Sequence, residues 1–148
     1  MAYDLLSEDD TRAAAFALVE ASRYVLVISV SPDGKTPKTR LMSPVAHHGA
    51  IWFRTRRASA KVRQMRQRPG VEVVATVEEF AQMTRFSGSV QLFASAEPAR
   101  DAGAPERFAD TFDETLGEQR LLVKFTPHSV HYVDHRARRR GMAPFISG

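Results

Sequence analysis

The sequence predicts a mainly β protein with peripheral helices, an α+β fold built on an antiparallel barrel of six strands. Short apolar runs rich in β-branched residues recur along the chain, turn signals separate most of them, and helix-forming segments flank them. Hairpin connections between such strands are typical of an antiparallel barrel. The 148 residues suffice for one domain, 1–148, with its own hydrophobic core.

The chain is expected to begin with a helix and a hairpin. Ser7 followed by acidic residues is an N-cap signal, and strong helix formers occupy 13–21. The apolar run 24–30 is typical of a central strand. A Pro-Asp-Gly-Lys turn at 32–35 then predicts a return strand over 36–46, because Pro fixes φ and Asp-Gly favours the positive-φ position.

The middle of the chain predicts three more strands and a second helix. We expect a strand over 50–55 and then a helix over 58–68, which a Pro-Gly pair ends. Another strand is expected over 71–77 and a long one over 82–96, where Gly88 indicates a bulge or sharp bend.

The last third predicts a helix, a closing strand and a tail. Phe108 and Phe112 are one helical turn apart within the Ala-, Asp- and Glu-rich segment 98–117. Residues 120–134 form either one strand interrupted by a proline or two strands. The basic segment 136–148 is expected to be a tail.

Composition restricts the functional classes. Cysteine is absent, so disulfides, thiolate metal sites and thiol nucleophiles are excluded. No apolar window has the length of a membrane span, and the N-terminus lacks the layout of a signal peptide, so we expect a cytoplasmic protein without a membrane partner. The histidines near the C-terminus do not form a ligand set, and no metal is expected. The arginine run 136–140 has no aromatic platform beside it, which argues against nucleic-acid binding.

The net charge of +4 is distributed unevenly, and its densest part predicts an anion site. Two strands and a helix start are expected to bring Arg40, Thr55, Ser59 and Lys61 within reach of one anion. Ser59 is placed as an N-cap, so the N–H groups of Ala60 and Lys61 would point at a bound phosphate. Spacing alone leaves open that these cations only solvate strand edges and a helix.

The order of four motifs resembles a known family. These motifs are Thr-Arg-Leu-Met, Trp-Phe-Arg-Thr-x-x-x-Ser-x-Lys, Pro-Gly-Val-Glu-Val-Val and Phe-Ser-Gly-Ser-Val. They resemble the pyridoxamine 5′-phosphate oxidase-like family of FMN-binding split β-barrels, including its general stress protein branch. The likeness extends from about Val25 to Phe93.

The resemblance implies an FMN-dependent oxidoreductase and a homodimer with the cofactor in a groove between its subunits. It gives Arg40 and Lys61 as phosphate ligands, and Leu41, Met42 and Ser43 as contacts of the flavin ring and ribityl chain. The remaining cofactor-binding residues that it implies are Phe53, Arg54, Thr55, Ser59 and Ala60. No acid, base or nucleophile is nominated.

The resemblance does not include the substrate-binding half of the family pattern. Met83 stands where the vitamin-pathway oxidase has a glutamine, and the C-terminal Arg-x-His-x-Arg signature is not reproduced. The substrate is therefore not expected to be pyridoxamine phosphate. Two alternatives remain: a related barrel that holds deazaflavin F420 or haem, and a non-catalytic flavin-binding stress or regulatory module.

Overall fold

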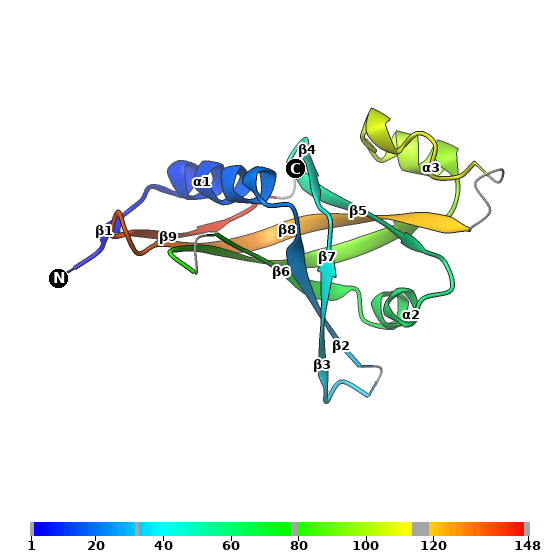
Figure 1. Cartoon of the computed structure of the whole chain (residues 1–148), viewed down its shortest axis with the longest axis horizontal. Helices are drawn as coiled ribbons and strands as arrows, with labels where there is room; N and C mark the ends of the chain where they lie inside the picture. The colour runs from blue at the N-terminus through cyan, green and yellow to red at the C-terminus, as the bar shows by residue number, and fades with distance from the viewer. Residues whose placement is uncertain (1, 32, 78–79, 114–118, 147–148) are drawn as a thin grey trace.

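A computed structural model describes residues 2–31, 33–77, 80–113 and 119–146 (Figure 1). The described residues form nine strands, three α-helices and one short 3-10 helix. The strands are β1 (Asp4–Leu5), β2 (Val25–Val30), β3 (Pro37–Met42), β4 (Val45–His47), β5 (Ala50–Arg56), β6 (Gly70–Val77), β7 (Gln82–Phe93), β8 (Arg120–Asp134) and β9 (Arg139–Pro144). The helices are α1 (Glu8–Ala21), α2 (Ala60–Gln67), α3 (Ala96–Asp101) and the 3-10 helix η1 (Glu106–Phe108).

All strands join one sheet, in the order β1-β9-β8-β7-β6-β2-β3, with β5 paired to both β8 and β4. Every pairing is antiparallel except that of the two-residue β1 with β9. The α+β prediction is confirmed. Nine strands replace the six expected, because β1 and β9 were not foreseen and a break before Val45 divides the return strand into β3 and β4.

The sheet curls without closing. β3 pairs with β2, and β5 pairs with β4 and β8, but in the described part of the chain no ladder joins β3 to β5. The barrel is therefore split between these two strands. In Figure 1 the β2–β3 hairpin points down from the rest of the sheet, beside α2.

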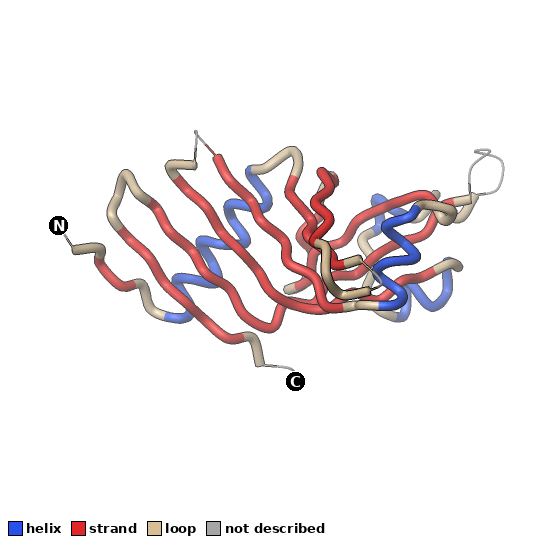
Figure 2. Tube along the Cα trace, turned by 90° about the horizontal axis from the view of Figure 1, so that it is seen from below, coloured by secondary structure: helices blue, strands red, loops and turns tan. Residues whose placement is uncertain are grey.

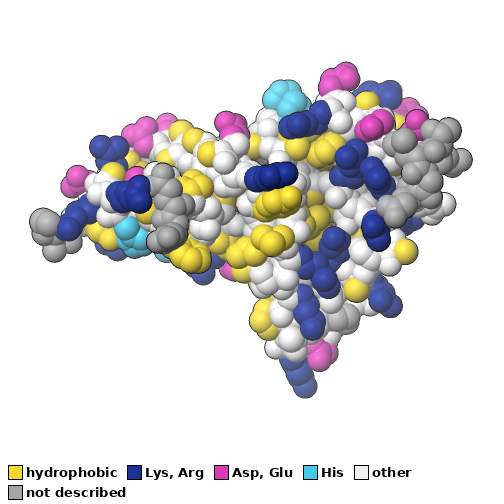
Figure 3. All heavy atoms as spheres, in the orientation of Figure 1, with side chains coloured by type: hydrophobic (Ala, Val, Ile, Leu, Met, Phe, Trp, Pro, Cys, Tyr) yellow, Lys and Arg dark blue, Asp and Glu magenta, His cyan; other side chains and the backbone are white. Residues whose placement is uncertain are grey.

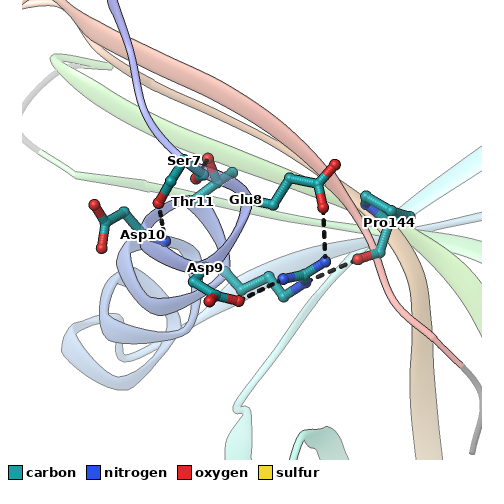
Figure 4. A network of polar contacts seen from close by, with 7 residues as sticks. Ser7, Glu8, Asp9, Asp10, Thr11 and Pro144 are labelled. Atoms are coloured by element: carbon teal, nitrogen blue, oxygen red, sulfur yellow. Dashed lines mark hydrogen bonds and ion pairs between the residues drawn. The ribbon is translucent and has the colours of Figure 1, made fainter.

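Helix α1 covers one face of the sheet, and Figure 2 shows it behind the strands. Ser7 is its N-cap, with Oγ accepting from the Asp10 N–H at 3.0 Å, as the sequence predicts (Figure 4). Arg12 joins the helix to the C-terminal strand by donating from Nε to the Pro144 carbonyl at 2.8 Å. Leu18 and Val19 are buried in the core below.

Alternation along the strands separates a core face from an open face. On β2 the side chains of Val25, Val27 and Ser29 are buried, whereas those between them are half-buried on the other side. The core-facing residues of most strands join one apolar cluster with α1 and α2. In the left part of Figure 2 the other face of the sheet is turned to the viewer, and no helix lies over it there.

The predicted bulge at Gly88 lets β8 run unbroken through Pro127. The β7–β8 register shifts between Ser87 and Gly88, and Gly88 then lies opposite Pro127, which has no N–H to donate. A Cβ on Gly88 would meet the Thr126 carbonyl oxygen at 2.2 Å, so only glycine allows this approach. Of the two alternatives for 120–134, the single strand is observed.

The expected C-terminal tail is wrong for 139–144, which form β9. β9 pairs with β8 and packs under α1, where Ala143 is buried. Gly141 makes this packing possible, since a Cβ there would lie 1.9 Å from the Thr11 hydroxyl oxygen. The strand depends on this packing, which the arginine-rich sequence does not show.

The helix expected within 98–117 is shorter than predicted. α3 ends at Asp101, and Pro105 precedes a single 3-10 turn that ends at Phe108. Phe108 and Phe112 pack beside a second apolar cluster around Trp52 instead of forming one helix face. Residues 114–117 of that prediction lie outside the described residues.

Candidate functional site

Strand β3 positions Arg40 on the core side of the sheet. Arg40 is directly opposite Val27 in the β2–β3 ladder, and cross-strand partners project to the same face. Val27 is buried, so the Arg40 side chain is directed inward at the split edge of the barrel. Its Nε is buried and has no hydrogen-bond partner among the described residues.

Strand β5 presents a second buried polar group. Phe53 and Thr55 share the core face of β5, and Phe53 packs in one cluster with Met42 of β3 and Val62 of α2. Thr55 is 6% exposed, and its Oγ1 also lacks a partner among the described residues. An unsatisfied buried polar group costs about 1–3 kcal/mol, so the two donors on the strands of the split would be stabilised by an acceptor such as an anion.

Helix α2 starts beside these groups. Ser59 is its N-cap, and the Oγ accepts from the Val62 N–H at 3.4 Å. Helix geometry leaves the N–H groups of Ala60 and Lys61 without acceptors inside the helix. A buried hydrogen bond from Ser29 Oγ to Gln64 Oε1, at 3.3 Å, ties α2 to β2 and fixes the position of the helix start.

The lowered pKa of Lys61 shows that Arg40 and Arg56 lie close to it. Burial lowers the pKa of Lys61 most, and the nearby charges of Arg40 and then Arg56 lower it further. All three effects penalise the charged lysine, and a bound anion would relieve them. We call Arg40, Thr55, Ser59 and Lys61 the anchor; the prediction that these residues surround one anion remains a prediction.

The side chain of Arg54, a predicted cofactor-binding residue, does not lie with those of the anchor. Strand alternation puts it on the opposite face of β5, where its Nη1 lies 3.3 Å from Asp110 Oδ1. Its guanidinium also lies over the Phe108 ring, 5.6 Å from the centroid. Only the backbone of Arg54 remains available to a ligand at the split.

The other predicted residues lie around the anchor in different ways. Met42 and Phe53 are buried in the core behind it. Leu41 is 68% exposed and lies on the open face, opposite to Arg40. Ser43 is exposed, and its Oγ donates to the Arg23 carbonyl at 3.3 Å. Ala60 is exposed in the first turn of α2.

Sequence reasoning did not include Arg56 in the site. Its charge acts on Lys61, although strict alternation along β5 would pair it with Arg54 on the other face. Arg56 is the last residue of the strand, where the chain turns towards α2 and alternation no longer decides direction. Its place in a run of cations without an acid was the available signal.

The open face of the sheet is the second notable surface. It holds a wide hollow of about 940 Å³ that extends from β1 and β9 to β2. Ile28, Val74 and Met83 contribute apolar surface, and Arg85 and Arg140 contribute charge. The exposed Met142 and Leu41 also belong to this face. Figure 3 shows apolar and cationic side chains side by side where the β2–β3 hairpin joins the sheet.

Two other kinds of site find no support in the part of the chain that the structure describes. No group of His, Asp or Glu side chains there is arranged to hold a metal ion. No helix among these residues combines the length and apolar character that a membrane crossing requires.

The fold defines the class of this protein as a small split antiparallel barrel, here with cationic side chains at its opening. The family model described as pyridoxamine 5′-phosphate oxidase matches residues 11–134. The chain belongs to this family. The match includes all residues of the anchor. No curated protein sequence matches the chain.

Solved structures with the same fold are numerous. A pyridoxamine 5′-phosphate oxidase-related, FMN-binding protein from Nostoc punctiforme is 20% identical, with a TM-score of 0.67 over 88% of this chain and 85% of its own. A protein from Clostridium acetobutylicum related to general stress protein 26 is 16% identical, with a TM-score of 0.70 over 95% and 97%. A structure named F420 reductase is 20% identical, with a TM-score of 0.58 over 77% and 93%. Such identities establish the fold alone.

Proposed function

We propose that the chain is an FMN-binding flavoprotein whose anchor holds the phosphate of the cofactor. The observation that carries this proposal is Arg40 Nε, which is buried without a partner among the described residues and belongs to a cation that acts on Lys61. Thr55 Oγ1, on the strand across the split, is also buried without a partner among these residues. A phosphate monoester accepts hydrogen bonds on three oxygens and carries nearly two negative charges near pH 7. It therefore matches both the donors and the charge.

Each anchor residue has a distinct role in this proposal. The guanidinium of Arg40 binds two phosphate oxygens, Lys61 adds a point charge, and the Thr55 hydroxyl donates one hydrogen bond. Ser59 holds the start of α2 so that the N–H groups of Ala60 and Lys61 face the anion.

The strand Leu41–Met42–Ser43 and the backbone around Phe53 and Arg54 would lie along the flavin ring and ribityl chain. The flavin supplies hydride or electron transfer when bound, and the protein binds, orients and shields it. We propose an oxidoreductase on this basis. Pyridoxamine phosphate is not the proposed substrate, because the matching substrate residues are missing from the sequence.

We further propose that the protein is a homodimer with the cofactor in a groove between the subunits, and that the second copy covers the open face, on which Leu41 of the proposed flavin-contacting strand is exposed. Met83 and Met142 are 36% and 69% exposed on this face. Apolar surface of this kind on a sheet is typical of an interface. Light scattering should give a dimer for the unmodified chain and a monomer for Met83→Glu/Met142→Glu. A monomeric unmodified chain at micromolar concentration would remove this part of the proposal.

Deazaflavin F420 is the second candidate cofactor, because one structural neighbour is named F420 reductase. The phosphate anchor does not distinguish the two, since either ligand would be held through an anionic group. Haem is the third alternative. A non-catalytic flavin-binding module is expected to hold FMN with no turnover.

The test is to purify the protein, release any bound small molecule by denaturation, and identify it by absorbance and mass. We expect FMN, and we expect the flavin-free protein to quench the fluorescence of added FMN. A colourless protein that leaves FMN fluorescence unchanged would sink the proposal. Reduction of the bound flavin by NADH or NADPH, followed across a panel of acceptors, separates an oxidoreductase from a module.

A further inference from the structure

The side of α2 that faces away from the anchor carries a separate groove of about 260 Å³. Its lining residues are Arg57, Ala58, Ser59, Val62, Arg63 and Arg66. The four helical or capping positions 59, 62, 63 and 66 follow the i, i+3, i+4, i+7 spacing of one helix face. Val62 is 3% exposed and forms the floor, and the three exposed arginines form the rim.

The groove is cationic without an acidic counterpart. From Arg54 to Arg68 the sequence has seven cations and no acid. Within residues 2–31, 33–77, 80–113 and 119–146, none of the ion pairs that Arg12 and Arg54 make involves an arginine of the groove. Arg57 is oriented by a neutral partner, since its Nη1 donates to Gln119 Oε1 at 3.3 Å.

The groove and the anchor are two different anion positions. Successive residues of a helix are about 100° apart, so Lys61 and Arg63 point to nearly opposite sides of α2. Lys61 interacts with Arg40 of β3, whereas Arg63 and Arg66 line the groove. Ser59 is shared, because the N-cap lies at the end of the helix axis.

We propose that this groove binds the diphosphate group of a nucleotide. Each guanidinium presents a fork of donors that fits two oxygens of a phosphoryl group, and the three positive charges exceed the nearly two negative charges of one phosphate monoester. A diphosphate supplies the additional oxygens and charge. Arginine also stacks on planar rings, so the rim suits a base next to the phosphates.

The inference goes beyond the proposed FMN site and does not depend on it. A nucleotide in the groove would be a second ligand beside the anchor, with the chemistry of a pyridine dinucleotide electron donor or of a free nucleoside diphosphate. These two sources share the diphosphate, and the experiment separates them by comparing ADP with NADPH.

The experiment measures binding by calorimetry on the flavin-loaded protein, with ADP, pyrophosphate, NADPH and adenosine as probes. We expect ADP to bind, adenosine not to bind, and the ADP affinity to fall as salt is added. If NADPH binds more tightly than ADP, the groove is assigned to the electron donor. If the two bind equally, the groove is assigned to a free nucleotide. If pyrophosphate binds as tightly as ADP, the base contributes nothing, and the proposal that the ligand is a nucleotide is overturned.

The variant is Arg63→Gln/Arg66→Gln, since glutamine is nearly as good a helix former as arginine. The matched control, Lys35→Gln/Arg107→Gln, removes the same charge from exposed residues outside the groove. We expect ADP affinity to fall about tenfold or more in the groove variant and by about twofold or less in the control. Flavin content, read from absorbance, should be unchanged in both.

Three results would overturn the groove: no ADP binding to the unmodified protein, equal ADP affinity in the groove variant, or displacement of flavin by ADP. Displacement would mean that a single anion position serves both ligands. An oligonucleotide that binds where ADP does not would also overturn it. If the protein holds no flavin but ADP still binds, and binds more weakly to the groove variant, the FMN proposal fails and the groove proposal stands.

Discussion

Arg40 and Arg54 lie on β3 and β5, the two strands on either side of the split, and they have opposite surroundings. Arg54 is neutralised: Asp110 lies 3.3 Å from its Nη1, and the Phe108 ring lies under its guanidinium. Arg40 has a buried Nε without a partner among the described residues, and its charge acts on another cation, Lys61. One arginine is satisfied by the fold, and the other is not.

This difference separates a structural arginine from a binding arginine. A cation that the fold itself pairs contributes to stability, and a ligand would have to displace its partner. A cation held next to other cations costs stability until an anion arrives, and the relief of that cost adds to the affinity of the anion. We therefore expect the core face of β5, towards which Arg40 of β3 is directed, to be the binding side. The opposite face of β5, with Arg54 and Trp52, attaches α3 and η1 to the barrel.

The largest expected effect is that of Arg40→Gln on FMN binding. Loss of a charged, forked donor to a phosphate removes about 1.5–3 kcal/mol, which corresponds to roughly 10- to 100-fold weaker binding. Titration of flavin-free protein with FMN, followed by fluorescence quenching, measures the dissociation constant. Thermal unfolding of the flavin-free variant should show no loss of stability, since an unpartnered charge has been removed.

The control for this prediction is Arg54→Gln, which removes the same charge one strand away. Its FMN affinity should stay within about twofold of the unmodified protein, since its side chain lies on the other face of β5. Equal losses in both variants would mean that net charge, not the anchor, governs binding.

Lys61 should make FMN binding depend on pH. Burial, then Arg40, then Arg56 lower its pKa in the ligand-free protein, and a bound phosphate dianion raises the pKa again. FMN affinity should therefore be constant below the lowered pKa and fall as pH rises through it. Titrations from about pH 7.5 upward avoid the second phosphate ionisation near pH 6.

The matched variant is Lys61→Arg, which keeps its charge throughout this range and should give a flat profile. The same lowered pKa has a consequence for stability. Between the folded and unfolded pKa values the unfolded chain binds more protons, so the stability of the flavin-free protein should rise with pH across that window. A rise of equal size in Lys61→Arg would assign it to another group.

Much of this fold follows from local signals. The caps at Ser7 and Ser59 start their helices where the sequence predicts, and the buried alternation of 25–30 is that of a strand with one core face. The β7–β8 register breaks at Gly88 and Pro127, two residue types that the sequence alone singles out, because glycine has no side chain and proline has no N–H. In each case the signal lies in a single residue or in residues close in sequence.

The features that could not be predicted depend on partners far along the chain. The arginine-rich segment of β9 has no strand signal of its own. Glycine is required at position 141 because Thr11 of α1 leaves no room for a Cβ there. In the same way Arg54 is distinguished from Arg40 by Asp110, which lies 56 positions later. A cluster of cations in a sequence can suggest an anion site, but its acidic neighbours decide which cations are available.

Thr55→Val tests the neutral donor of the anchor, and its expected effect is smaller. The variant keeps the β-branched shape and removes a buried hydroxyl that has no partner among the described residues. A net contribution of about 0.5–1.5 kcal/mol predicts FMN binding roughly 3- to 10-fold weaker. The flavin-free variant should unfold at the same or a higher temperature; a clear decrease would show that the hydroxyl is satisfied within the fold.

The smallest expected effect belongs to the structural side of the comparison. Asp110→Asn removes the partner of Arg54, an ion pair whose two side chains are 35% and 61% exposed. Exposed pairs contribute about 0.2–1 kcal/mol, so denaturant unfolding should show at most a slight loss of stability. FMN affinity should stay within about twofold, since Arg54 still lies over Phe108 on the far face of β5. A gain in FMN affinity would mean that the released Arg54 reaches the phosphate, and that the fold holds the two arginines apart only through Asp110.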